Sequence, residues 1–215
     1  MNKSSSCIRQ GSWEWDNTRK GDRMKWGKAV LTAVGAAVLL AAFVGTASAG
    51  RLSTSGLGVN GTWTTVRFAG GIGTGECEVI LNGAFHERSI SKTRGTLSGF
   101  VTAANITRCA RGGGTILRET LPWHVRYEGF AGTLPTITTI RASVVGLAFR
   151  IREPTFGIEC LSRSTTEEPG TVNFNLNGSG VMTSASLGGT IRCGSFSGTI
   201  SGTSSSITAL TVTLI

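Results

Sequence analysis

Few side chains in this sequence combine the types and the spacing that catalysis needs. Glu76 and Glu78 would share one face of a β-strand about 7 Å apart, a separation that suits the paired carboxylates of sugar hydrolysis. His86 and His124 are the only histidines, and no G-x-S-x-G motif offers a serine nucleophile. Each of these groups has a plainer role, such as pairing with arginine. The sequence therefore predicts no enzyme and no bound cofactor or metal.

Four cysteines follow the first 49 residues. Cys77, Cys109, Cys160 and Cys193 are expected to form two intrachain disulfides, because an even number of cysteines is typical of proteins in oxidising compartments. Zinc is excluded, since no two of them stand at the short spacing of a zinc knuckle. Their spacing alone allows three ways of pairing them.

A weak internal repeat helps to choose among these pairings. The two cysteine pairs are separated by 32 and 33 residues, and the sequence around them agrees when the pairs are superposed. We infer a duplication with half-repeats at about 63–120 and 146–204. It favours Cys77–Cys109 and Cys160–Cys193, while pairing across the halves stays open. The superposition matches Glu76 with Glu159, Arg67 with Arg150, Arg108 with Arg192, and residues 114–116 with 198–200.

The first 49 residues contain the elements of an export signal. Lys25 and Lys28 precede an apolar run over residues 29–44. Small residues follow, and Ala47 and Ala49 stand at the two positions that signal peptidase contacts. We therefore expect cleavage after Ala49.

This signal divides the chain into three parts. Residues 1–23 are a polar leader or the product of an overcalled start codon, residues 24–49 are the signal peptide, and the mature protein begins at Gly50. A membrane anchor is the alternative for the apolar run. That run has about 16 residues, which is short of the ~20 that span a bilayer.

Removal of the leader and signal changes the charge balance. The whole chain has a net charge of +9, and residues 50–215 keep a net charge of +5 and contain no aspartate. The basic residues are scattered and are not grouped with aromatic residues, so no nucleic-acid partner is expected. We expect a bacterial protein that is secreted or held at the cell surface, with no stable membrane insertion after cleavage.

Composition and alternation predict β-structure for the mature chain. Residues 50–215 hold 26 glycines, 26 threonines and 17 serines, which suit strands and turns. Apolar and polar residues alternate over 77–81, 123–127, 145–151 and 172–176, so each segment has one buried face. The sequence therefore predicts an all-β fold, either an antiparallel β-sandwich or a small barrel, in a single domain.

Two features of this fold concern binding and assembly. An exposed tryptophan can stack on a sugar or an apolar compound, and Trp63 is the candidate, whereas Trp123 is expected in the core. The nearly uncharged segment 207–215 would pair with a neighbouring molecule if it formed an edge strand.

The segment Leu121-Pro122-Trp123 gives the sequence a resemblance to a known group. It follows Cys109 by twelve residues and precedes a second cysteine pair. With the richness in glycine, serine and threonine, this pattern resembles small exported bacterial β-proteins of the alkane-oxidation-activator type. The resemblance implies a non-catalytic protein of the cell surface, the extracellular space or a biofilm matrix.

The function expected from the sequence is therefore structural or surface-interacting. The partner would be the protein itself, in a homo-oligomer or a matrix, or a cell-surface component. The alternative is a secreted module that binds carbohydrate or a hydrophobic compound.

Overall fold

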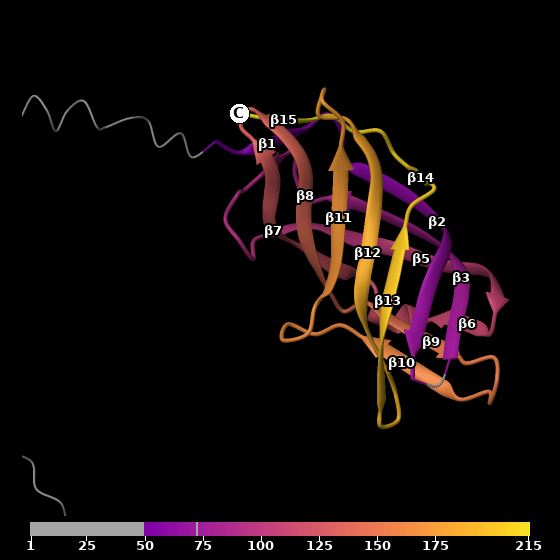
Figure 1. Cartoon of the computed structure of the whole chain (residues 1–215). Coiled ribbons are helices and arrows are strands. Elements are labelled where there is room, and N and C mark those ends of the chain that lie inside the picture. The colour runs from indigo at the N-terminus through magenta and orange to yellow at the C-terminus, as the bar shows by residue number, and fades with distance from the viewer. Residues whose placement is uncertain (1–49, 72) are drawn as a thin grey trace, which may run out of the picture. The chain divides into compact units, whose positions relative to one another are not determined.

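The alternating segments form strands in the computed structural model, which describes residues 50–71 and 73–215 (Figure 1). The strand pairs are antiparallel throughout, which confirms the all-β prediction. The main sheet contains β2 (Gly58–Gly70), β3 (Gly73–Phe85), β5 (Leu97–Arg111), β6 (Gly113–Ile116), β7 (Trp123–Thr133), β8 (Thr136–Val145), β9 (Ala148–Arg152), β10 (Glu159–Arg163), β11 (Gly170–Leu176), β12 (Met182–Cys193), β13 (Phe196–Thr203) and β14 (Ser206–Ile207).

The main sheet closes on itself. β11 pairs with both β8 and β12, and between these two strands the pairing runs through β7, β5, β3, β2 and β13. Eight strands thus form a ring, and the apolar side chains on one face of each strand point into it. Of the two predicted architectures, the closed, barrel-like sheet is the one found.

Three further strands extend the wall of this barrel. β10 pairs with β12, β9 with β10, and β6 with β9, while β6 follows β5 across a turn at Gly112. The φ of +77° at Gly112 favours glycine. Two groups of strands thus complete the wall, β7–β8–β11 and β6–β9–β10. The long strands between them belong to both parts of the wall: β2, β3, β5, β12 and β13. β9 and β10 lie at the end of the barrel remote from β1 (Leu52–Thr54) and β15 (Val212–Leu214) (Figure 1).

Both disulfides pair as the repeat predicts. Cys77–Cys109 joins β3 to β5, and Cys160–Cys193 joins β10 to β12. The two halves have the same order of strands, β2, β3, β5 and β6 in the first and β9, β10, β12 and β13 in the second. The last strand of each half pairs with the first strand of the other, β6 with β9 and β13 with β2. This order is the one expected of a duplication, which itself stays a prediction.

A small second sheet covers one end of the core. It consists of β15 (Val212–Leu214), β1 (Leu52–Thr54) and β4 (Ser89–Ile90), in that order. Leu52, Ile90 and Val212 are buried against the barrel's apolar residues. Farther in, the Phe149 ring packs edge-on against Phe68 and Trp123 with ring centroids 5.6 Å apart, so one aromatic cluster links the two strand groups.

Two segments differ in detail from their predictions. The segment predicted to alternate over 145–151 is broken, because Gly146 has a φ of +89° and turns the chain from β8 into β9. The terminal segment 207–215 is divided between β14 and β15. β15 pairs with β1 on one side, and on the other the Val212 N–H donates to the Gly180 carbonyl. Little free edge therefore remains there.

Residues 1–49, with the predicted leader, signal peptide and Ala49 of the cleavage site, lie outside the described residues. Gly50 is the first residue that the structure describes. Within the described part, no helix is long and apolar enough to cross a membrane.

Candidate functional site

Trp63 lies inside the barrel, so the prediction of an exposed stacking surface there is wrong. Its side chain is 3% exposed, and its Nε1–H donates to the Ala185 carbonyl at 3.1 Å. Gly61 makes this placement possible, because a Cβ there would lie 2.7 Å from the indole ring. Trp123 is fully buried, as predicted.

Trp63 and Trp123 line an apolar cavity within the β7–β8–β11 part of the barrel. Its volume is about 60 Å³. An apolar cavity that holds benzene is larger, roughly 150 Å³. The interior therefore has no room for a sugar or a large hydrophobic compound in this conformation. Other residues around the cavity include Phe85, Val125, Val144, Val172, Phe174 and Leu187.

Loops at the β9–β10 end of the barrel form the stronger candidate site, which we call the braced end. It consists of the turns from β2 to β3, β5 to β6 and β12 to β13, and the loop over residues 153–158 between β9 and β10. The Cys160–Cys193 bridge lies beside it, against the same small hollow as Gly73 and Glu153. The braced end thus joins loops from both halves of the chain.

Glu153 organises the 153–158 loop. It is 4% exposed, and its carboxylate accepts the backbone N–H groups of Thr155 and Phe156 at 2.7 Å each. Burial alone would raise the pKa of the Glu153 carboxyl, but these hydrogen bonds outweigh it and the pKa lies below its usual value. A Cβ at Gly73 would come within 2.6 Å of this carboxylate, so the β2–β3 turn needs glycine there. The loop is therefore held by its own backbone and by the neighbouring turn.

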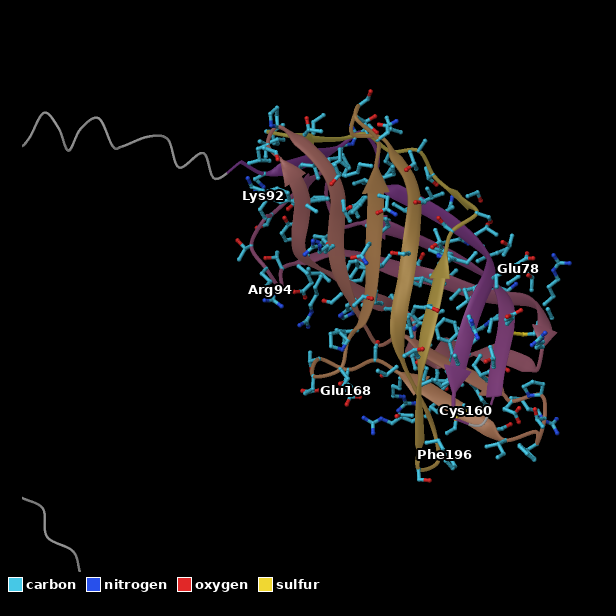
Figure 2. All side chains as sticks on the ribbon, viewed as in Figure 1. Glu78, Lys92, Arg94, Cys160, Glu168 and Phe196 are labelled. Atoms are coloured by element: carbon cyan, nitrogen blue, oxygen red, sulfur yellow. A yellow bond between two sulfur atoms is a disulfide. The ribbon has the colours of Figure 1, made fainter. Side chains whose placement is uncertain are left out.

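Two phenylalanines project from the braced end. Phe156 is 72% exposed and Phe196 is 52% exposed. Phe196 flanks the β2–β3 turn, because its ring lies against Gly71. Phe156 belongs to the loop whose Glu153 lies against Gly73 of the same turn. Figure 2 shows Phe196 at the tip of the β12–β13 hairpin, at the opposite end from Lys92. Three of the eight large apolar residues that are exposed in the described part lie here: Phe156, Ile158 and Phe196.

Three arginines stand on strands that lead into these loops, Arg111 at the end of β5 and Arg150 and Arg152 on β9. Arg150 pairs with Glu159 at 3.8 Å, whereas Arg111 and Arg152 form no ion pair within the described residues. The Arg152 guanidinium lies against the backbone of Gly157, one residue after Phe156. Glu76 and Glu159 stand opposite Arg111 and Arg152 in the sheet, so the braced end combines exposed aromatic rings with arginines and nearby carboxylates.

Of the groups considered for catalysis, Glu76 stands between Arg67 and Arg111 in the sheet, close to the braced end, and the others lie farther away. The Glu78 carboxylate accepts a hydrogen bond from Arg108 at 3.0 Å, so it is an ion-pair partner. His86 and His124 are exposed and contact opposite sides of Phe100, with ring centroids 5.8 and 5.4 Å from it. Neither histidine meets a nucleophile or a carboxylate among these contacts.

Comparisons with protein-family models, curated proteins and solved structures found no match. The fold and the bridges define the class: a disulfide-bonded, antiparallel, barrel-like protein of the kind found in oxidising environments. Sequence reasoning missed the braced end. The signal available was the Glu153-Pro154-Thr155-Phe156 segment, in which an acid and a proline precede an exposed aromatic residue.

Proposed function

We propose that this protein is an exported, non-catalytic surface-interaction protein that makes its contact through the braced end. The observation that carries the proposal is the exposure of Phe156 and Phe196 on loops held by a buried carboxylate and a disulfide. A rigid loop loses little conformational freedom on binding, so more of the contact energy of its aromatic residue is available for affinity.

The partner that fits this surface is an anionic cell-surface layer with an apolar region beneath it, such as a lipid headgroup layer. Arg111 and Arg152 would approach the anionic groups, while the two phenylalanines would enter the apolar region. This contact is peripheral and needs no spanning segment. It is one form of the cell-surface partner expected from the sequence.

Self-assembly through the terminal strands of the two sheets is less well supported by the geometry. The terminal strands β4, β6 and β15 have two to four residues each, whereas the longer unpaired edge of β5 beyond Val101 lies within the barrel wall. Short edges of this kind are a common defence against strand-to-strand association. The resemblance to matrix proteins of the alkane-oxidation-activator type therefore supports the surface location in the proposal more than polymerisation.

Vesicle sedimentation tests the proposal. The protein should co-sediment with vesicles containing phosphatidylglycerol and much less with phosphatidylcholine alone, and added salt should weaken the binding. The double variant F156S/F196S should bind at least about tenfold more weakly, because burying one such side chain contributes roughly 1.5–3 kcal/mol.

The matched control is L134S, which removes an exposed apolar residue from the turn between β7 and β8. Its binding should equal that of the unaltered protein. Equal binding to both vesicle types, or no effect of the phenylalanine replacements, would contradict the proposal. Large species in sedimentation velocity without vesicles would favour a matrix protein instead.

A further inference from the structure

One strand of the barrel wall is paired on a single side over much of its length. β5 pairs with β3 from Gly99 to Arg111, but with β7 only from Leu97 to Val101. Beyond Val101, no strand of the described part forms a ladder with its other edge, since β6 pairs with β9. Alternate residues over 102–111 therefore direct their backbone N–H and C=O groups toward an open side.

A groove of about 340 Å³ follows this open edge. Four consecutive β5 residues, 102–105, line it. Successive residues of a strand point to opposite faces, so contact with four in a row brings the groove to the strand's free edge. Ile80 and Asn82 are the ladder partners of Asn105 and Ala103, so the groove also covers the outer face of β3 and β5 there. Ala104 faces the core, whereas Ala103 and Asn105 are exposed. The volume is within the range of ligand sites, roughly 300–1,000 Å³.

The opposite wall of the groove is the segment that follows β6. Arg118, in the short helix η1 (Arg118–Thr120), and Leu121 line this side, and Ile80 and Asn82 of β3 form the floor. Arg118 is exposed and forms no ion pair within the described residues. Its charged neighbour on η1 is Glu119, which does not line the groove.

The second half of the chain has a strand in the corresponding place. Counted back from the cysteines, residues 102–109 of β5 correspond to residues 186–193 of β12. β12 pairs over those residues with β13, from Cys193 opposite Phe196 to Ser186 opposite Thr203. In the first half the chain turns away to β9, and the groove occupies the position of the missing strand.

We infer that this groove binds an extended peptide, which adds to β5 as an antiparallel strand and directs a carboxylate to Arg118. Backbone hydrogen bonds to residues 102–111 supply the affinity, as in other cases of strand addition. The Arg118 guanidinium supplies selectivity, because it binds a carboxylate through two parallel hydrogen bonds. The site is separate from the braced end and does not depend on the function proposed there.

The probe is a labelled synthetic peptide with the sequence of residues 196–203, which fills the corresponding place in the second half. By analogy with β13, its C-terminal carboxylate would lie beside Thr102, which lines the groove together with Arg118. Fluorescence anisotropy with the full chain should show saturable binding. Amidation of the peptide C-terminus should weaken it by about fivefold or more, and N-methylation of alternate backbone amides should abolish it.

Two variants locate the site. R118Q should weaken binding of the carboxylate peptide and leave that of the amidated peptide unchanged. A103F should block the groove, and both positions are exposed, so the fold should persist. Hydrogen exchange should slow at residues 102–111 when the peptide is bound. Non-saturable peptide binding, binding that N-methylation does not affect, or slower hydrogen exchange only at other residues would overturn the inference. It would also be overturned if the peptide did not bind while oligosaccharides bound saturably and A103F blocked their binding.

Discussion

Replacing Cys160 and Cys193 by alanine tests how the braced end is held. Their bridge closes a loop with a sequence separation of 33 residues, and Cys77–Cys109 closes one of 32. The chain-entropy relation gives about 3.7 kcal/mol of unfolding free energy for the loss of either bridge at 25 °C. Loop length therefore predicts nearly equal global losses for the two alanine pairs.

The sheet pairing predicts different local effects. Cys77 and Cys109 face each other within a long ladder, which keeps β3 and β5 together without the bridge. β10 is joined to β12 by the single ladder pair Leu161 and Arg192, with one further hydrogen bond from the Ser162 hydroxyl. Loss of the Cys160–Cys193 bridge should therefore release β10 from β12, whereas β9 keeps its ladder with β6 and its buried Phe149.

Urea unfolding measures the global effect and amide hydrogen exchange measures the local one. Both alanine pairs should lose about 3–4 kcal/mol of unfolding free energy. Residues 159–163 should lose protection in C160A/C193A and keep it in C77A/C109A, which serves as the matched control. Equal protection of residues 159–163 in the two variants would refute the reasoning from the sheet pairing. Global losses below about 1 kcal/mol would refute the loop-entropy estimate.

Three further variants test single contacts by urea unfolding. The pKa of Glu153 is lowered in the folded protein, so this residue contributes stability at neutral pH that is lost as the pH falls. E153Q should therefore make the unfolding free energy less dependent on pH below about 5. An unchanged dependence of the unfolding free energy on acid pH would contradict this. W63F removes the hydrogen bond to the Ala185 carbonyl and should cost about 1–2 kcal/mol, and a neutral effect would count against that bond. V144I adds a methyl group beside the 60 Å³ cavity and should stabilise the fold by about 0.5–1 kcal/mol, whereas a lower urea midpoint would show that the methyl group does not fit.

The strands were predictable because alternation is a local property. Val79 and Leu81 are buried, as are Val172 and Phe174, and each belongs to a segment whose pattern predicts one buried face. The disulfide pairing was predictable for another reason. A repeat places each cysteine pair in equivalent surroundings, and the structure joins the pairs in that way.

The burial of Trp63 was not predictable from its neighbours in the sequence. Its hydrogen-bond acceptor, Ala185, lies 122 residues away in the sequence and belongs to β12. The same difficulty applies to closure, which depends on β11 pairing with two different strands. Glu153 was missed because the N–H groups that hold it belong to a loop whose shape the residue types do not specify.

The pairing of the barrel has a consequence for the order in which the protein folds. β1 and β2 come first in the described chain, yet β1 pairs with the last strand, β15, and β2 pairs with β13 and β14 near the C-terminus. The ring cannot close until the chain is available as far as Thr203, so β2 keeps one edge unpaired until the C-terminal strands reach the compartment in which the protein folds. Contacts between such distant segments slow folding. The chain before closure, rather than the finished barrel, is therefore the form most exposed to aggregation.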